Sequence, residues 1–258
     1  MECTKAILVV SFGTSYTETR KKTIEAIENE IRTSFPDRRI YRAWTSKKII
    51  QKLKNRDGLQ IDTVAEALTR MHADGIKEVV IQPTHVMSGF ENDAMEADVE
   101  AQKAQFASLS YGAPLLSSRE DLDAMADLLA EAFASLSETE ALILMGHGTE
   151  HQANTVYTDL NETLKGKGLN RFFVATVEAH PGMDEIRAFL KDLKPTRVVL
   201  TPFMIVAGDH ANHDMAGADE DSWKSILEGD GYRVDCVLKG LGEYEAVRRR
   251  FALHAGRA

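Results

Sequence analysis

The chain is poor in cysteine: Cys3 and Cys236 are the only two among its 258 residues. Two isolated thiols provide neither a disulfide framework nor a cysteine-based zinc site. Long apolar runs are also missing, because no stretch approaches the length of about 20 residues that a membrane-spanning helix needs. The first residues lead directly into a strand-like segment without an apolar signal region. We therefore expect a cytoplasmic protein with no membrane segment.

Familiar nucleotide-binding and hydrolase motifs are absent as well. There is no Walker A sequence, no G-x-G-x-x-G after a strand and no G-x-S-x-G elbow. The formal net charge is −9, whereas nucleic-acid binding usually needs a basic face. Apolar residues make up 43% and charged residues 28% of the chain, as in an ordinary globular protein. The sequence predicts no nucleic-acid partner and no organic cofactor.

Short apolar runs alternate with helical patterns along the whole chain, which predicts parallel β-sheets flanked by helices. The expected strands are 6–10, 39–44, 78–82, 113–116, 141–145, 171–177, 197–200 and 233–238. The expected helices are 15–35, 47–54, 63–75, 93–106, a segment capped by 117–120, 153–164, 183–193, 219–227 and 244–254.

The order of elements starts again near residue 141, which indicates an internal repeat. Phe12-Gly13-Thr14 aligns with His147-Gly148-Thr149, and Pro83 and Pro202 each stand six residues before a glycine. Turn residues that recur in the same order predict two similar α/β lobes with an active-site cleft between them. Chance similarity between two α/β halves is the alternative. The predicted lobes are 1–125 and 126–258, and the second one carries the catalytic histidines.

Residues 141–151 form the most informative stretch of the sequence. Five apolar residues in a row predict a strand buried on both faces. Gly146 and Gly148 bracket His147, so the backbone can turn sharply and a ligand can approach closely. Ligand sites of open α/β sheets lie at the carboxyl ends of the strands, where this histidine is expected. A histidine that merely caps a strand is the plainer interpretation.

Three further polar side chains follow other predicted strands: Glu91, Glu178 and His210. Parallel strands all end at the same edge of a sheet, so these groups and His147 can converge. Two imidazoles and carboxylate suit a divalent first-row metal such as cobalt, nickel, iron or zinc. The sequence therefore predicts a metal site, although the spacing itself is not a recognised metal motif.

The remaining histidines are assigned more weakly. His151 stands four residues after His147, but glycine occupies the position that glutamate has in a zinc-binding H-E-x-x-H helix. His213, three residues after His210, is expected at the surface, and a second metal ligand is the alternative. The other four fall into two groups: His85 and His180 near the rim of the predicted cleft, and His72 and His254 on exposed helix faces.

A strand-to-helix turn surrounds Ser11, Thr14 and Ser15. Exposed N–H groups and the helix dipole at such a turn favour a carboxylate or a phosphate. An ordinary helix cap explains the same residues equally well. We expect Ser11, Phe12, Thr14, Ser15 and Ser88 to contribute to substrate binding.

Two segments resemble a known family. Met145-Gly-His-Gly-Thr149 and the run Thr201-Pro-Phe-Met-Ile-Val-Ala-Gly-Asp-His-Ala-Asn-His-Asp-Met-Ala-Gly217 are similar to the anaerobic-type sirohydrochlorin cobalt chelatases, which are class II tetrapyrrole chelatases. Shorter likenesses extend the resemblance over nearly the whole chain. The resemblance implies two α/β halves that hold the tetrapyrrole, and insertion of Co2+ into sirohydrochlorin on the anaerobic route to cobalamin.

Residue roles are implied by the same resemblance. His147 matches the family's catalytic histidine and His210 its second metal histidine. Glu91 matches an active-site glutamate, and Glu178 is similar to another metal-site carboxylate. How these two glutamates divide the work stays open. Cobalt would be a substrate in this reaction, and the expected partners are sirohydrochlorin and a divalent metal ion. The sequence leaves the oligomeric state open, with a homo-oligomer as one alternative.

Metal insertion requires that the ion lose its water shell and that the pyrrole N–H protons leave the macrocycle. His147 can hold metal and then accept a proton, because imidazole titrates near neutral pH. Glu91 is expected to take or relay the other proton. The alternatives are a non-enzymatic tetrapyrrole or metal carrier, a chelatase for Ni2+ or Fe2+, and a metal-dependent hydrolase, which lacks a nucleophile motif.

Overall fold

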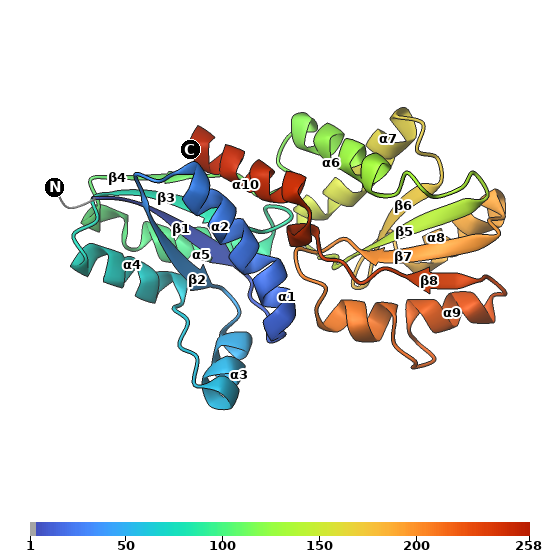
Figure 1. The fold of residues 1–258 in the computed structure, drawn as a ribbon, viewed down its shortest axis with the longest axis horizontal. Coiled ribbons are helices and arrows are strands. Elements are labelled where there is room, and N and C mark those ends of the chain that lie inside the picture. The colour runs from blue at the N-terminus through green and yellow to red at the C-terminus, as the bar shows by residue number, and fades with distance from the viewer. Residues whose placement is uncertain (1–3) are drawn as a thin grey trace. The chain divides into compact units, whose positions relative to one another are not determined.

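The computed structural model describes residues 4–258, which divide into two compact units. Unit 1 combines the chain up to Ser117 with Gly242–Ala258, and unit 2 comprises Ser118–Leu241. Among the described residues, the strands form two four-stranded parallel sheets, one in each unit (Figure 1). None of the helices formed by residues 4–258 is long and apolar enough to cross a membrane. Cys3 lies outside the described residues.

The sheet of unit 1 has the strand order β2-β1-β3-β4. Its strands are β1 (Lys5–Ser11), β2 (Arg39–Trp44), β3 (Glu78–Pro83) and β4 (Ser108–Tyr111). The helices are α1 (Thr17–Lys22), α2 (Ile24–Ser34), α3 (Lys47–Asp57), α4 (Val64–Ala73), α5 (Phe90–Glu100) and α10 (Glu245–Arg257), with 3₁₀ turns at Lys103–Gln105 and, at the boundary of the units, Leu241–Glu243.

The central strand β1 is apolar because the sheet is covered on both faces. Ala6, Leu8 and Val10 join the core that α4 and α5 cover. On α2, Ile24 and Ile27 are buried at helical spacing, as predicted. Figure 1 shows α2 and α10 side by side, and these two helices pack against each other.

The sheet of unit 2 has the order β6-β5-β7-β8. Its strands are β5 (Glu140–Gly146), β6 (Phe172–Thr176), β7 (Arg197–Pro202) and β8 (Val234–Cys236). The helices are α6 (Arg119–Ala132), α7 (Thr155–Gly166), α8 (Met183–Leu193) and α9 (Trp223–Gly229), with a 3₁₀ turn at Gln152–Asn154 and a short π-helical turn at Ala211–Met215.

The two sheets have the same strand arrangement. In each sheet, the strand that comes first in the sequence (β1 or β5) lies between the second and the third strands. In unit 1, Val10 pairs with Pro83, and the next amide, of Thr84, donates to the Val10 carbonyl. Met145 pairs with Pro202 in the same way, and the Phe203 amide donates to its carbonyl. The predicted fold class of two similar parallel α/β lobes is confirmed.

The compact units differ from the predicted lobe ranges in two places. The expected boundary between residues 125 and 126 falls inside α6, which belongs wholly to unit 2. Helix α10 belongs to unit 1, because it packs on α2 and β3. His254 on this helix is buried and its Nδ1 lies 3.0 Å from the Ala113 carbonyl, so the prediction that it is an exposed residue is wrong.

Three local predictions in unit 1 are also wrong. Residues 113–116 form no strand: Leu115 and Leu116 are buried in a loop, and the fourth strand is 108–111. The helix expected at 93–106 is α5 and lies at 90–100. The first helix begins at Thr17 without a side-chain cap, and a break in helical geometry at Thr23 separates α1 from α2. Buried apolar residues alone do not distinguish a strand from a covered loop.

Candidate metal centre

His147 stands at the carboxyl end of β5, in a turn that glycine makes possible. Gly148 has φ +84°, and a Cβ there would lie 2.8 Å from the Ala179 nitrogen and from Thr176 Cβ. The main chain of Gly146 is equally confined, because a Cβ would meet the Tyr157 ring at 2.5 Å. The confined backbone holds the His147 side chain at the strand end, where 49% of it is exposed.

Glu178 is placed beside His147 by an extension of the β-ladder. Beyond the end of β6, the Val177 amide donates to the Gly146 carbonyl at 3.1 Å, and the Glu178 amide donates to the His147 carbonyl at 2.9 Å. The Glu178 carboxylate then lies 3.6 Å from His147 Nδ1. These backbone bonds explain why two residues 31 positions apart in the sequence share one site.

His210 comes from the loop after β7, directly before the π-helical turn. Its ring is perpendicular to that of His147, with an interplanar angle of 89° and 4.7 Å between the ring centroids. Its Nδ1 lies 2.5 Å from a carboxylate oxygen of Asp214, one turn later. Turns of π-helix are rare and are often found at functional sites.

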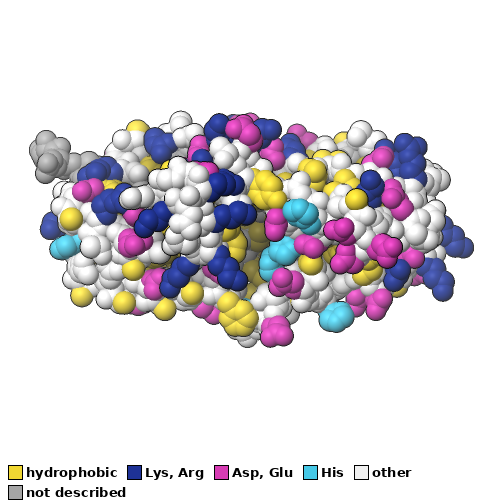
Figure 2. All heavy atoms as spheres, turned by 90° about the horizontal axis from the view of Figure 1, so that it is seen from below, with side chains coloured by type: hydrophobic (Ala, Val, Ile, Leu, Met, Phe, Trp, Pro, Cys, Tyr) yellow, Lys and Arg dark blue, Asp and Glu magenta, His cyan; other side chains and the backbone are white. Residues whose placement is uncertain are grey.

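Together His147, Glu178 and His210 offer ligand atoms within 4.8 Å of one another. All three belong to unit 2. Figure 2 shows histidine side chains beside acidic side chains on an exposed face. Two imidazoles and one carboxylate match the preferences of divalent first-row metals, and a set of three protein ligands leaves coordination positions open.

Hydrogen bonding indicates which nitrogen of each imidazole is free to bind a metal ion. His147 Nδ1 lies 2.9 Å from the Gly148 carbonyl, which can only accept, so Nδ1 carries the hydrogen. The carboxylate of Asp214 assigns the same tautomer to His210. In the neutral ring, Nε2 then keeps its lone pair. Both histidines are therefore prepared to coordinate through Nε2.

Glu91 lies in unit 1, in the first turn of α5, and is exposed. It was expected in a loop following the third strand, but helix α5 begins one residue before it. Near Glu91, His85 is buried. Burial lowers the pKa of the His85 imidazole, and interactions with Asn92 and the Glu91 carboxylate offset this only in part. His85 is therefore a neutral interior residue.

The five residues expected to bind substrate lie around the ends of β1 and β3 in unit 1. Ser11 and Thr14 are buried, and the Thr84 hydroxyl donates to Ser11 Oγ at 2.8 Å. Phe12 is 48% exposed, Ser15 is half-buried and Ser88 is exposed. Helix α1 is only six residues long. Its N-terminus therefore gives little support to the predicted anion site.

The other histidines have local partners. His151 caps the 3₁₀ turn Gln152–Asn154, because its Nδ1 accepts a hydrogen bond from the Ala153 amide. His180 Nδ1 lies 3.0 Å from Glu185 Oε1. His213 is exposed, as predicted, and its Nδ1 lies 3.3 Å from Asp209 Oδ1. Asp214 is the residue of the site that the sequence analysis missed. Its position four residues after His210, one helical turn away, was the available signal.

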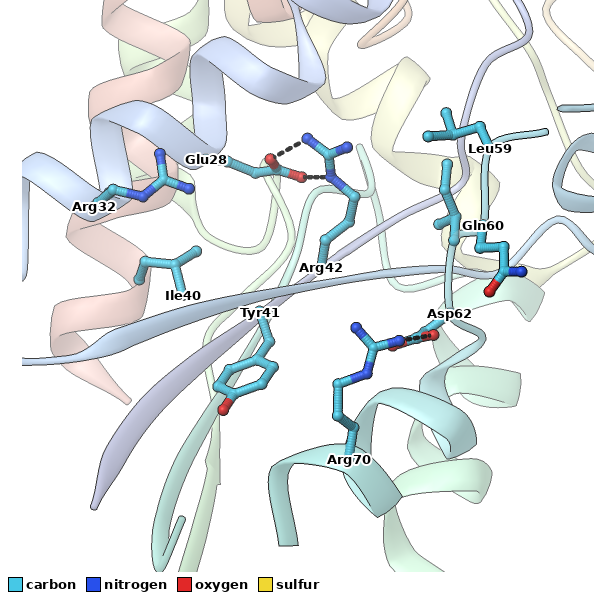
Figure 3. Close-up of a pocket in the computed structure, with 10 residues that line it drawn as sticks. Glu28, Arg32, Ile40, Tyr41, Arg42, Leu59, Gln60, Asp62 and Arg70 are labelled. Atoms are coloured by element: carbon cyan, nitrogen blue, oxygen red, sulfur yellow. Dashed lines mark hydrogen bonds and ion pairs between the residues drawn. The ribbon is translucent and has the colours of Figure 1, made fainter. Parts of the chain in front are cut away.

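Unit 1 also contains a hollow of about 330 Å³ beside the edge strand β2, shown in Figure 3. Its charged side chains largely satisfy one another: Arg42 binds Glu28 through two hydrogen bonds of 2.6 and 2.5 Å, and Arg70 pairs with Asp62. None of the predicted site residues lines it. This internal pairing is typical of a structural role.

Comparison with known proteins assigns the chain to a family. The model of the cobalt chelatase (CbiK) family matches residues 5–258. The chain belongs to this family. The sirohydrochlorin cobaltochelatase of Salmonella typhimurium is 41% identical over an alignment of 256 residues, with 98% of this chain and 96% of that protein covered. The sirohydrochlorin cobaltochelatase CbiKC of Nitratidesulfovibrio vulgaris is 33% identical, over 93% and 86%.

Solved structures of two other proteins share the fold. SirB from Bacillus subtilis with Fe3+ superposes with a TM-score of 0.70 at 12% identity, covering 98% of this chain and 94% of that one. CbiX, described as the terminal enzyme for biosynthesis of siroheme in denitrifying bacteria, gives a TM-score of 0.61 at 18% identity, with 98% and 99% covered. At these identities the likeness concerns the fold. The expected resemblance to cobalt chelatases is confirmed by the family match.

Proposed function

We propose that this chelatase inserts Co2+ into sirohydrochlorin, as a step of anaerobic cobalamin biosynthesis. The observation that carries the proposal is the group of His147, Glu178 and His210, whose ligand atoms lie within 4.8 Å in a member of the cobalt chelatase family. A relative that is 41% identical over nearly the full chain bears the name of this activity. Cobalt is a substrate in this proposal.

The three side chains suit transient metal binding. Glu178 supplies an anionic oxygen, and the two histidines supply neutral nitrogens through Nε2. Because the histidines and glutamate are partly exposed, the ion can enter with part of its water shell and exchange the remaining water ligands for pyrrole nitrogens. A fully enclosed four-ligand site would retain the metal instead.

Insertion also releases two protons from the pyrrole N–H groups for each ion. Once cobalt transfers to the macrocycle, His147 Nε2 regains its free lone pair and can accept one of them. Glu91 takes or relays the second, as an exposed carboxylate able to pass a proton to solvent. In this division of roles Glu178 is a metal ligand and Glu91 is a proton acceptor.

Substrate contacts are proposed for the loops that follow β1 and β3 and for the first residue of α5. Phe12 and Phe90 are 48% and 59% exposed, and such aromatic rings can lie against the apolar face of a macrocycle. Ser15 and Ser88 present hydroxyls that can bind substrate carboxylates. The buried Ser11 and Thr14 act indirectly by holding the loop. The cytoplasmic location and the homo-oligomer stay predictions from the sequence.

The decisive experiment supplies purified protein with excess sirohydrochlorin and Co2+, and follows the visible absorption of the tetrapyrrole through many turnovers. His147→Ala should lower the rate by about 100-fold or more, the range for loss of a group that transfers protons. His213→Ala is the matched control, because this exposed histidine lies outside the metal group.

Two results would contradict the proposal. Wild-type rates in His147→Ala would remove this residue from the reaction. A single stoichiometric binding event without turnover would indicate a tetrapyrrole or metal carrier. Parallel assays with Ni2+ and Fe2+ decide the metal, since the same ligands accept each of them.

A further inference from the structure

The two metal-site histidines differ in what holds their Nδ1 atoms. His147 Nδ1 lies 2.9 Å from the carbonyl of its neighbour Gly148, a neutral acceptor. His210 Nδ1 lies 2.5 Å from Asp214 Oδ2, a carboxylate. Hydrogen bonds to charged acceptors are shorter and stronger than those between neutral groups. The ring of His210 is therefore held more firmly.

We propose that Asp214 is a positioning residue that makes His210 the anchoring metal ligand, whereas His147 is the ligand that lets go. The inference rests on the proposed function, because it requires His210 to bind Co2+. Asp214 itself acts only through the imidazole, and no contact of Asp214 with the metal is involved.

The local backbone supports this role. Asp214 lies within the π-helical turn Ala211–Met215, which begins directly after His210. At the end of this turn the Ala216 amide donates to the Ala211 carbonyl, five residues earlier, at 3.2 Å. The π-helical turn thus holds the segment that carries Asp214, and the Asp214 carboxylate holds the ring of His210.

The chemistry follows from the carboxylate. Asp214 accepts a hydrogen bond from His210 Nδ1–H. This bond leaves the lone pair on Nε2 and increases the electron density that the ring offers to a metal. The hydrogen bond also restricts the rotation of the His210 ring before metal binds, so that binding loses less side-chain entropy. Within residues 4–258, no carboxylate lies at hydrogen-bond distance from His147 Nδ1, since Glu178 is 3.6 Å away. Its weaker hold suits a ligand that must dissociate and accept a proton.

The same segment provides a matched control. Asp209 and His213 are also four residues apart, and Asp209 Oδ1 lies 3.3 Å from His213 Nδ1. This second pair is exposed and contributes no atom to the metal group. Removing Asp209 therefore takes the same charge from the same loop without touching the ring of His210.

The experiment measures Co2+ affinity by titration of the full-length protein, and the kcat and the KM for Co2+ in the insertion assay. Asp214→Ala should weaken Co2+ binding and raise the KM by about 10- to 100-fold, the usual effect of losing a partner of a metal-bound histidine. At saturating Co2+ the kcat should stay within about twofold of wild type. Asp214→Asn should recover part of the affinity, because its amide oxygen accepts the Nδ1 hydrogen without the charge.

Asp209→Ala should behave as wild type in all three measurements. The proposal is overturned if Asp214→Ala binds Co2+ as wild type does, or if Asp214→Ala and Asp209→Ala lose affinity equally. A drop in kcat and melting temperature shared by Asp214→Ala and Asp214→Asn, without partial recovery of affinity, would assign Asp214 a merely structural role. His210→Ala separates the two levels: wild-type Co2+ binding in that variant contradicts the metal site itself, whereas its loss together with normal binding in Asp214→Ala contradicts only this inference.

Discussion

Units 1 and 2 build the same turn at the end of their first strands and use it differently. Gly13 has φ +104°, and a Cβ there would lie 2.5 Å from the ring of Trp44, at the end of the neighbouring strand. In unit 2, Gly148 is confined in the same way by Thr176. The residue before the glycine is Phe12 in unit 1 and His147 in unit 2.

A shared backbone therefore does not imply shared chemistry. His147, Glu178 and His210, which offer the metal-binding atoms, all belong to unit 2. In the sequence repeat Glu91 corresponds to His210, because each stands two residues after the glycine that follows Pro83 or Pro202. In unit 1, a buried carboxylate, that of Glu28, is instead neutralised by Arg42. The difference teaches that the repeat supplies positions at strand ends, and the side chains decide whether a position binds metal, contacts a macrocycle or stays structural.

The largest expected effect tests whether metal affinity belongs to unit 2 alone. Glu178→Ala should weaken Co2+ binding by about 100-fold, equivalent to about 2.7 kcal/mol, because it removes one of three ligands. Glu91→Ala should leave Co2+ affinity unchanged while lowering kcat. Titration calorimetry and the insertion assay measure the two quantities. Equal losses of affinity in both variants would mean that the metal site draws on both units.

A second prediction compares the two turn glycines. Gly13→Ala and Gly148→Ala should each lower the free energy of unfolding by about 2 kcal/mol, because both positions combine a positive φ with no room for a Cβ. Only Gly148→Ala should also weaken Co2+ binding, since the added Cβ presses on the chain that carries Glu178. Urea unfolding and Co2+ titration test this. Gly58→Ala, at an open positive-φ site, shows the effect of the backbone alone.

A third prediction concerns the charge pair of unit 1. Glu28→Gln should destabilise the protein by about 1.5 kcal/mol, because the buried side chain loses its charge-assisted bonds to Arg42. Co2+ affinity should not change, since neither residue belongs to the metal group. Exposed Glu18, paired with Lys21, is the control, and its replacement by glutamine should have no measurable effect on unfolding. A loss of Co2+ binding in Glu28→Gln would show that the hollow beside β2 affects the site.

The smallest effect is a dependence of stability on pH. Burial lowers the pKa of His85 from 6.5 in the folded protein. Just below pH 6.5, His85 therefore becomes protonated in the unfolded chain but stays neutral in the folded protein. The contribution of His85 to the free energy of unfolding is therefore fully present above pH 6.5 and is lost as the pH falls below that value. His85→Asn should flatten this slope, as measured by urea unfolding at several pH values. The exposed His72→Asn is the control for replacing a histidine by asparagine.

Sequence periodicity predicted the repeated fold because the central strands are apolar throughout and α8 begins and ends as expected. It failed where burial came without secondary structure, as in the loop around Leu115, or where a distant partner covered a helix, as at His254. The proximity of His147, Glu178 and His210 was predictable because parallel strands end at one edge, whereas their binding of metal stays a prediction. Asp214 was missed although its spacing of four residues from His210 was visible, because no pattern of apolar residues predicts the π-helical turn that holds it.

Unit 2 is a continuous stretch of chain inserted into unit 1, whose last helix is α10. During synthesis, residues 118–241 can collapse around their own core as soon as they emerge, whereas the earlier strands must wait for α10 before Ile31 and its neighbours on α2 are fully covered. The unit that carries His147, Glu178 and His210 is thus the unit that can fold first. A released chain that ends after residue 241 should therefore contain a folded domain joined to an incomplete, protease-sensitive one.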